Sequence, residues 1–420
     1  MTGPTKVGLF GLLGSGNSGN QASTESVLAY LRRCHPEAEV DAMSAGFGWV
    51  ADNYGIAAIP LSWQEKYEHR PRGGSGIFRK ILSKLVDPIR IVRWVRRHDV
   101  VIVPGMGVLE ATLPLHAWGF PFTMFTLSAA GRACHVKVAL VSVGASVIRQ
   151  RATRQLLVGS ARLAYYRSFR DEYSKDAMRQ QGLDTTRDRV FPDLVFAFET
   201  PPHDPGDQRL VALGVMDYHG SNDDLARADE LHAAYLEQMT SFAGWLLDNG
   251  YRIRFFGGDD SCDYAAADEI IARLQGRPVG SRAAGSVTAD SVTAGSVTAG
   301  SLTVARFTKY TEMLDQMNQA GTVVATRFHN VLAGLLLGKP TLAIGYSHKF
   351  VDLMASTGLP EFVQPAHELD AAELIVKFKE TQARRDEIMA QIRQRNAAKG
   401  AAVTNQFAQL STVLFPSRGK

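Results

Sequence analysis

The chain has few cysteines and little net charge. It contains three cysteines among 420 residues, Cys34, Cys134 and Cys262. Their wide spacing fits neither a metal-binding nor a redox motif, and an odd number argues against a disulfide framework. The net charge of +4 is too small to indicate a nucleic-acid binder by itself. We therefore expect a cytoplasmic protein with no bound metal, no cofactor and no nucleic-acid partner.

Long hydrophobic runs are also missing. The longest apolar stretch, at about 331–345, is interrupted by Lys339 and Pro340, whereas a membrane-spanning helix needs about 20 consecutive apolar residues. The N-terminus lacks the basic start and apolar stretch of a signal peptide. Hydrophobic residues nevertheless make up 45% of the chain, which is ample for a packed core. The sequence thus predicts a globular protein of two or three domains.

The apolar residues form short β-type runs that alternate with helix-type runs. In the first half, the expected strands and helices cover residues 7–13, 23–34, 100–103, 136–143, 149–163, 165–169 and 172–181. After a proline-rich linker, they cover residues 210–215, 229–248, 252–256, 265–274, 323–326 and 341–344. Such alternation is typical of parallel sheets covered by helices. We predict two α/β domains at 1–200 and 207–370 that face each other across a cleft, and a helical segment at 371–420 that packs back on the first domain.

Two segments depart from this alternation. Residues 282–303 repeat a five-residue Gly-Ser-Val-Thr-Ala unit, and we interpret them as a mobile insertion because so few bulky side chains cannot build a core. Residues 70–97 carry nine basic side chains against one acidic one, with apolar residues at helical spacing. A helix packed on its own domain is slightly favoured there. Peripheral contact with the inner face of a membrane is the alternative.

The most informative segment is Arg327, Phe328 and His329, between a strand-type and a helix-type run. In open α/β sheets, ligands bind at such junctions, beyond the carboxyl ends of the strands. A guanidinium can fork onto a carboxylate or phosphate, and an imidazole can deliver a proton near neutral pH. This pair is suited to an anionic substrate whose reaction needs acid catalysis.

Other polar residues occupy similar junctions. Arg170 ends an expected strand, where it is suited to an anion or, as residue type alone favours, to a surface pair with Asp171 or Glu172. Lys349 follows the strand at 341–344 and adds a further cation. The glycine-rich turn at 14–21 contains no P-loop lysine. It is compatible both with a ligand-binding loop and with an ordinary tight turn.

Taken in order, these segments resemble the polysaccharide pyruvyl transferase family. The turn at 16–20 is similar to its Gly-Asn-x-Gly-Asp loop, with Asn20 in place of Asp. Residues 168–174 are similar to its Ser-x-Arg-Asp-x-x-Ser segment, and residues 327–329 to its Arg-x-His block. Further matching segments lie at 105–107, 143–145, 192–193, 338–340 and 346–349.

The resemblance implies two facing Rossmann-like α/β domains of the glycosyltransferase-B type. It implies phosphoenolpyruvate as donor and a sugar hydroxyl pair, in a glycan or glycolipid of the cell envelope, as acceptor. His329 is then the expected acid. The expected phosphoenolpyruvate-binding residues are Arg170, Arg327 and Lys349, and the expected acceptor-binding residues are Asn17, Asn20, Gln21 and Glu110.

Two other functions are compatible with these patterns. A nucleotide-sugar-dependent glycosyltransferase of the same fold would also use glycine turns and basic residues. A basic membrane-surface or glycan-binding protein would use residues 70–97 without catalysis, but it would leave the junction at 327–329 unexplained.

Overall fold

The computed structural model describes residues 4–63, 76–110, 117–202, 204–220, 224–258, 262–276 and 300–415. The chain divides into two compact units. The N-terminal unit comprises residues 1–15, 20–198 and 399–420, and the C-terminal unit comprises residues 16–19 and 199–398. Most of the repeat at 282–303 and the start of the basic segment at 70–97 lie outside the described residues.

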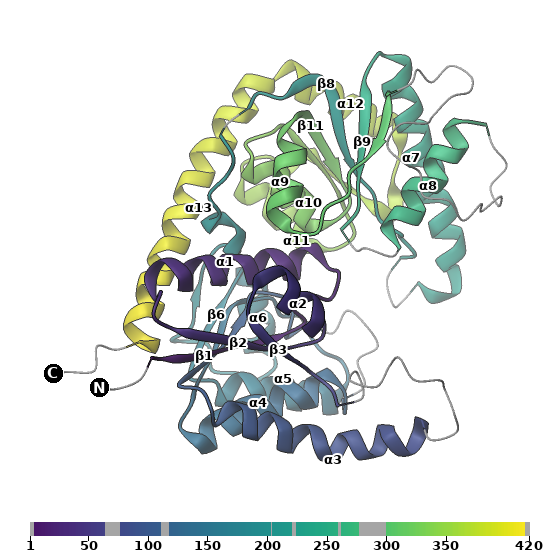
Figure 1. Cartoon of the computed structure of the whole chain (residues 1–420). Coiled ribbons are helices and arrows are strands. Elements are labelled where there is room, and N and C mark those ends of the chain that lie inside the picture. The colour runs from purple at the N-terminus through teal and green to yellow at the C-terminus, as the bar shows by residue number, and fades with distance from the viewer. Residues whose placement is uncertain are drawn as a thin grey trace. The chain divides into compact units, whose positions relative to one another are not determined.

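The N-terminal unit is built on a seven-stranded sheet of order β3-β2-β1-β4-β5-β6-β7. All the strand pairings described for it are parallel. Its strands are β1 (Lys6–Gly11), β2 (Glu39–Ser44), β3 (Ala57–Pro60), β4 (Val100–Pro104), β5 (Lys137–Val143), β6 (Tyr166–Phe169) and β7 (Arg189–Val190). Its helices are α1 (Ser18–Cys34), α2 (Phe47–Tyr54), α3 (Gly76–Val95), α4 (Phe120–Cys134), α5 (Arg151–Leu163) and α6 (Glu172–Gln180). Helices α1 and α2 cover one face of the sheet, and α3, α4 and α5 cover the other (Figure 1).

The C-terminal unit repeats this plan on a six-stranded parallel sheet of order β10-β9-β8-β11-β12-β13. Its strands are β8 (Asp207–Gly214), β9 (Arg252–Phe256), β10 (Leu302–Val304), β11 (Ala320–Ala325), β12 (Thr341–Gly345) and β13 (Val363–Pro365). Its helices include α7 (Ala228–Asp248), α8 (Asp263–Leu274), α9 (Tyr310–Asn318), α10 (Phe328–Leu336), α11 (His348–Ser356) and α12 (Ala371–Ala383). In each unit the first strand lies beside the fourth, which is the strand order of a Rossmann-type sheet.

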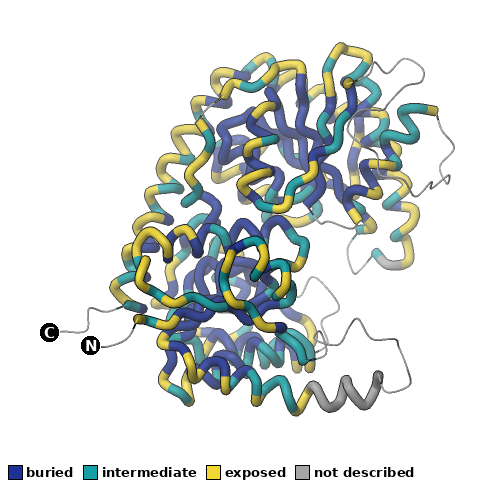
Figure 2. The backbone as a smooth tube through the Cα atoms, viewed as in Figure 1, coloured by how far each residue is buried: buried dark blue, intermediate teal, exposed yellow. Residues whose placement is uncertain are grey.

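The cores of both units consist of their strands. The residues of β4, β11 and β12 are buried throughout, and both sheets form buried layers beneath their helices (Figure 2). Parallel strands covered on both faces are expected to be continuous runs of apolar residues rather than alternating ones. The sequence shows this pattern in Val100–Pro104, which is why these strands are visible without a structure.

The last helix, α13 (Arg385–Leu414), contributes to both units. Its first part belongs to the C-terminal unit, where the Arg385 guanidinium donates hydrogen bonds to the carbonyl oxygens of Gly321 and Pro205 at 2.8 and 2.9 Å. Residues 399–414 belong to the N-terminal unit, where Gln406 Nε2 donates to Ser168 Oγ at 2.9 Å. Of the predicted segment 371–420, residues 371–398 thus belong to the C-terminal unit and residues 399–420 to the N-terminal unit.

Helix α3 covers the described part of the basic segment. Its last turns bury Trp94 in the N-terminal unit while Arg93 is exposed, and the helix continues through Pro88. This is the arrangement expected for a helix packed on its own domain. Among the described residues, no helix has an apolar stretch long enough to cross a bilayer. Membrane contact stays a prediction.

Candidate active site

The C-terminal unit gathers polar residues beyond the carboxyl ends of β8, β9 and β11. Strands β9 and β11 flank β8 on its two sides. The boundary between β8 and β11 is the point where the strand order reverses, and open α/β sheets bind ligands there. The residues that follow these strands include Asp217 after β8, Gly258 after β9 and Arg327 after β11.

The Arg327 side chain is held by a buried carboxylate. Arg327 is the N-cap residue of α10, with extended backbone. Its Nε donates to Asp263 Oδ2 at 2.8 Å and its Nη2 to Asp263 Oδ1 at 2.6 Å. The Asp263 side chain is fully buried, whereas 21% of the Arg327 side chain is exposed. The sequence suggested that two parallel N–H groups of this guanidinium bind a substrate anion. In this structure Nε and Nη2 bind a protein carboxylate instead.

Asp263 also receives two backbone hydrogen bonds. The N–H of Gly258 donates to its Oδ2 at 2.8 Å, and the N–H of Asp217 donates to its Oδ1 at 3.2 Å. Several hydrogen-bond donors offset the cost of burying this carboxylate and hold it in position. Asp263 therefore fixes the orientation of the Arg327 guanidinium. Sequence reasoning missed it, because an aspartate at the start of a helix looks like an ordinary capping residue.

His329 lies in the first turn of α10, two residues after Arg327. Its backbone oxygen accepts a hydrogen bond from the hydroxyl of the buried Tyr310 at 3.0 Å. Its ring packs edge-on to Phe328, with centroids 5.3 Å apart. An imidazole beside a guanidinium can donate a proton to an anion that the guanidinium binds.

Within the C-terminal unit, the glycine-rich turn packs against His329. A Cβ atom added to Gly19 would lie 2.2 Å from His329 Nδ1, so a larger residue there would displace the ring. The turn is held by the Ser18 N–H, which donates to the Gly258 carbonyl oxygen at 3.0 Å. The predicted acceptor residue Asn17 caps α1 by accepting the Gly19 N–H at 3.0 Å. The turn therefore shapes the surroundings of the imidazole.

Lys349 occupies the first turn of the next helix, α11. Its Nζ lies 5.3 Å from the centroid of the Phe328 ring and 5.4 Å from that of Tyr346. Because β11 and β12 are parallel neighbours, the helices that follow them begin at the same edge of the sheet. Helix N-termini carry partial positive charge and bind anions readily. Arg327, His329 and Lys349 thus share one electropositive edge.

In the N-terminal unit, Arg170 is a buried partner of Glu110. Its Nη2 donates to the Glu110 carboxylate, and its Nε lies 3.5 Å from Asp171 Oδ2. The Arg170 and Glu110 side chains are 7% and 14% exposed. The pair with Asp171 that residue type alone favoured is thus present, but Arg170 is mostly buried and also pairs with Glu110. Asp171 is the predicted N-cap of α6, with Oδ1 accepting the Ser174 N–H at 2.6 Å.

Asn20 and Gln21, both predicted to bind the acceptor, are engaged within the N-terminal unit. Asn20 Nδ2 donates to the Leu12 carbonyl oxygen at 3.2 Å and to Ser15 Oγ at 3.0 Å. Gln21 is 3% exposed. Asn20 thus stabilises the turn between β1 and α1, and Gln21 is buried. Contact of either residue with an acceptor stays a prediction.

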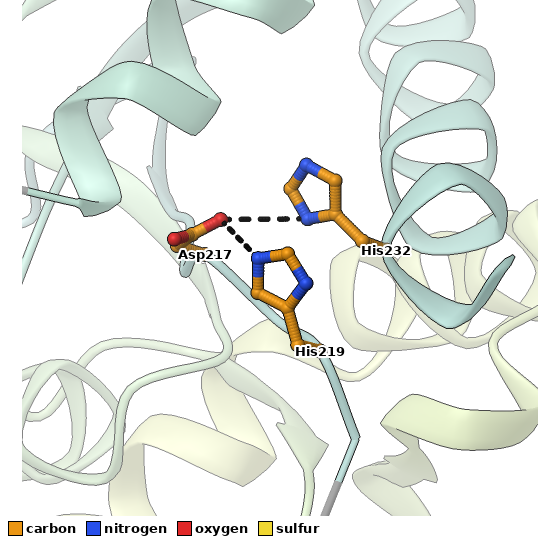
Figure 3. A group of neighbouring side chains, drawn as sticks. All are labelled: Asp217, His219 and His232. Atoms are coloured by element: carbon orange, nitrogen blue, oxygen red, sulfur yellow. Dashed lines mark hydrogen bonds and ion pairs between the residues drawn. The ribbon is translucent and has the colours of Figure 1, made fainter. Parts of the chain in front are cut away.

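Sequence reasoning also missed a group of three potential metal ligands, Asp217, His219 and His232 (Figure 3). They come from the loop after β8 and from α7, and only the fold brings them together.

Comparison with known proteins decides the family. The family model for polysaccharide pyruvyl transferases matches residues 17–348, which include the turn, Glu110, Arg170, Arg327 and His329. The chain belongs to the polysaccharide pyruvyl transferase family. This membership makes it a transferase that moves a pyruvyl group to a polysaccharide, at the level of the family, and it implies a sugar or polysaccharide acceptor. No curated protein sequence gave a match.

Solved structures with similar folds support the predicted fold class. The UDP-GlcNAc 2-epimerase from Neisseria meningitidis bound to UDP-GlcNAc is similar, with TM-score 0.56 and 12% identity over 97% of this chain and 99% of that one. A glycosyltransferase from Rickettsia africae has TM-score 0.56 and 11% identity over 99% and 100% of the two chains. At such identities the likeness concerns the fold alone. It confirms two Rossmann-like units of the glycosyltransferase-B type.

Proposed function

We propose that this pyruvyl transferase takes pyruvate from phosphoenolpyruvate and places it on two hydroxyls of one sugar in a cell-envelope glycan or glycolipid. The product is a cyclic ketal, and phosphate is released. The observation that supports this proposal is the grouping of Arg327, His329 and Lys349 in the first turns of α10 and α11, beyond adjacent parallel strands.

Phosphoenolpyruvate suits the group of Arg327, His329 and Lys349 because it carries both a carboxylate and a phosphate. A guanidinium binds either group through parallel hydrogen bonds, and an ammonium adds a point charge. The exposed fifth of the Arg327 side chain is the part that a ligand meets, while Asp263 prevents the guanidinium from turning away. Two helix N-termini add favourable partial charges.

The reaction needs a proton at the methylene carbon of the donor. Protonated His329 delivers it, which converts the methylene into a methyl group and leaves positive charge at the central carbon. The first sugar hydroxyl bonds to that carbon and loses its proton. The carbon–oxygen bond to phosphate then breaks, the second hydroxyl bonds to the same carbon, and its proton leaves. One hydroxyl proton restores His329 and the other leaves with the phosphate, so the protons balance. The acid step contributes about 10²–10⁴-fold in rate.

The N-terminal unit offers groups for the acceptor. Glu110, whose carboxylate is held by Arg170, is suited to accept hydrogen bonds from sugar hydroxyls. Asn20 and Gln21 of the same unit, and Asn17 of the C-terminal unit, remain further candidates. Arg170 remains a predicted donor ligand, although its pairing with Glu110 equally suits a role in holding that carboxylate.

The test is incubation of the purified chain with phosphoenolpyruvate and candidate cell-envelope glycans or glycolipids. We expect phosphate release that depends on the acceptor, together with a gain of one pyruvate ketal in the mass of the glycan. If a nucleoside diphosphate is released from a nucleotide sugar instead, and phosphoenolpyruvate is inert, the rival glycosyltransferase function is correct. Glycan or vesicle binding without turnover of either donor would indicate a binding protein.

A further inference from the structure

The C-terminal unit brings two histidines and an aspartate to one point. Asp217 Oδ1 lies 3.0 Å from His219 Nε2 and 3.4 Å from His232 Nδ1. The two imidazole rings are stacked, with centroids 4.3 Å apart and an angle of 6° between their planes. Figure 3 shows both rings directed toward the same carboxylate oxygen. From these contacts we infer that Asp217, His219 and His232 form a binding site for a divalent transition-metal ion such as Zn²⁺.

The separations between the ligand atoms fit such an ion. Ligands held about 2.0–2.1 Å from one zinc ion in tetrahedral geometry lie about 3.3 Å apart. The two separations from Asp217 Oδ1, 3.0 and 3.4 Å, are already close to that value. All three ligand atoms lie within 4.8 Å of one another, so small side-chain rotations complete the set. The Tyr218 carbonyl oxygen lies 3.3 Å from His232 Nδ1.

The chemistry of the ligands selects the kind of metal. Two imidazoles and one carboxylate favour zinc, nickel, copper or ferrous iron, whereas Mg²⁺ prefers oxygen ligands alone. His219 and Asp217 are partly exposed, at 44% and 30% of their side chains. An ion can therefore enter, and water can fill a remaining coordination position. His232 is fixed on α7, which makes one of the ligands rigid.

This site is connected to the residues around Arg327. The backbone N–H of Asp217 donates to the carboxylate of Asp263, which holds the Arg327 guanidinium. A metal ion on Asp217 would order the loop after β8 at its junction with that carboxylate. The metal site consists of the side chains of Asp217, His219 and His232 and does not depend on the proposed reaction.

The test is calorimetric titration of the untagged full-length protein, freed of metal by a chelator, with zinc chloride. An untagged chain is needed because a histidine tag binds zinc itself. We expect one equivalent to bind, and His219→Ala and His232→Ala each to weaken binding by more than about tenfold, since loss of even an outer-shell partner costs about 10- to 100-fold. Magnesium chloride should give no heat at this site.

The matched control is His367→Ala, which removes an exposed histidine that lies 3.4 Å from only one acidic group, Glu368. It should bind zinc like the wild type. Cobalt offers a second readout, because coordination by histidines gives visible absorption bands that should appear in the wild type and in His367→Ala but not in Asp217→Asn. The inference would be overturned if the wild type bound no zinc, or if folded His219→Ala and His232→Ala bound zinc with wild-type affinity.

Discussion

Each unit pairs one arginine of the family motifs with a carboxylate from a distant segment of the chain, but the two pairs present opposite groups to their surroundings. Arg170 follows β6 and pairs with Glu110, whereas Arg327 follows β11 and pairs with Asp263. In the N-terminal pair the carboxylate is the more exposed partner, at 14% against 7%. In the C-terminal pair the arginine is the more exposed partner, at 21% against a fully buried carboxylate.

This inversion suits the two pairs to different ligands. A partly exposed carboxylate accepts hydrogen bonds from hydroxyl groups, and a partly exposed guanidinium binds anions. The buried member of each pair then serves mainly to hold the other in place. The C-terminal pair is accordingly suited to the anionic donor, and the N-terminal pair to the hydroxyls of the acceptor.

The largest effect should come from the group beside the C-terminal pair. His329→Ala should lower kcat by about 10²–10⁴-fold, because the proton donor is lost. Affinity for phosphoenolpyruvate should stay near the wild-type value in calorimetry, because Arg327 and Lys349 are kept. Full turnover in this variant would remove His329 from the mechanism. The C-terminal pair would then have no proposed proton donor beside it.

Gly19→Ala should lower kcat by up to about 100-fold, as expected when a catalytic group is displaced by about 1 Å. The added Cβ would lie 2.2 Å from the His329 ring. The matched control is Gly48→Ala, because a Cβ atom at Gly48 meets no heavy atom within 4 Å. Steady-state kinetics of both variants decide the matter, and equal kcat values would show that the ring has room to move.

Arg327→Lys should raise the KM for phosphoenolpyruvate about tenfold or more, because an ammonium cannot fork and a hydrogen bond to a charged group contributes about 1.5–3 kcal/mol. Asp263→Asn should shift the same KM in the same direction while leaving the KM for the acceptor unchanged. A change in the donor KM without a change in the acceptor KM indicates that Asp263 positions Arg327. General destabilisation would appear instead as a lower Tm in thermal unfolding. An unchanged donor KM in Arg327→Lys would contradict the donor-facing assignment of this pair.

Glu110→Gln should raise the KM for the acceptor about fivefold, because a neutral amide accepts weaker hydrogen bonds than a carboxylate. The KM for phosphoenolpyruvate should hardly change. Arg170→Lys sharpens the comparison, since it shifts the acceptor KM if Arg170 holds Glu110 and the donor KM if Arg170 binds the donor directly. Kinetics with each substrate varied in turn would separate these outcomes.

The buried Lys339 is a cation whose side-chain hydrogen bonds go to backbone carbonyl oxygens. Its Nζ donates to the carbonyl oxygens of Asp204 and Asn318 at 2.6 and 2.5 Å, and burial lowers its pKa from 10.5 to about 8. Between these values the unfolded chain binds more protons than the folded one, so stability should rise with pH. We expect a gain of about 2 kcal/mol between pH 8 and 10. Urea unfolding should show this gain in the wild type and not in Lys339→Met.

Much of the fold was predictable because buried parallel strands are short, continuous apolar runs. The strand expected at 252–256 coincides with β9, and those expected at 100–103 and 341–344 end one residue early. The expected helix at 23–34 begins at Ser18 instead, because Asn17 caps it. The short strands β7, β10 and β13 were missed, since two or three residues show no periodicity. The longer strands β2 and β3 were also missed.

The candidate site was predictable only in part. Arg327 and His329 stand out because a strand-type run ends before them and a helix begins. Asp263 lies 64 residues away in the chain, and nothing local marks it as their partner. The same holds for His232, which the packing of α7 brings to Asp217 and His219.

The sequence by itself determined the alternation of strands and helices, the junction that carries Arg327 and His329, and the family. Local pattern is enough for these, because hydrophobic periodicity and helix starts depend on neighbouring residues. Only the tertiary structure decided which carboxylate holds each arginine, that Gly19 borders the imidazole, and that two histidines share one aspartate. Those contacts join strands whose order in the sheet differs from their order in the chain, so no local rule contains them.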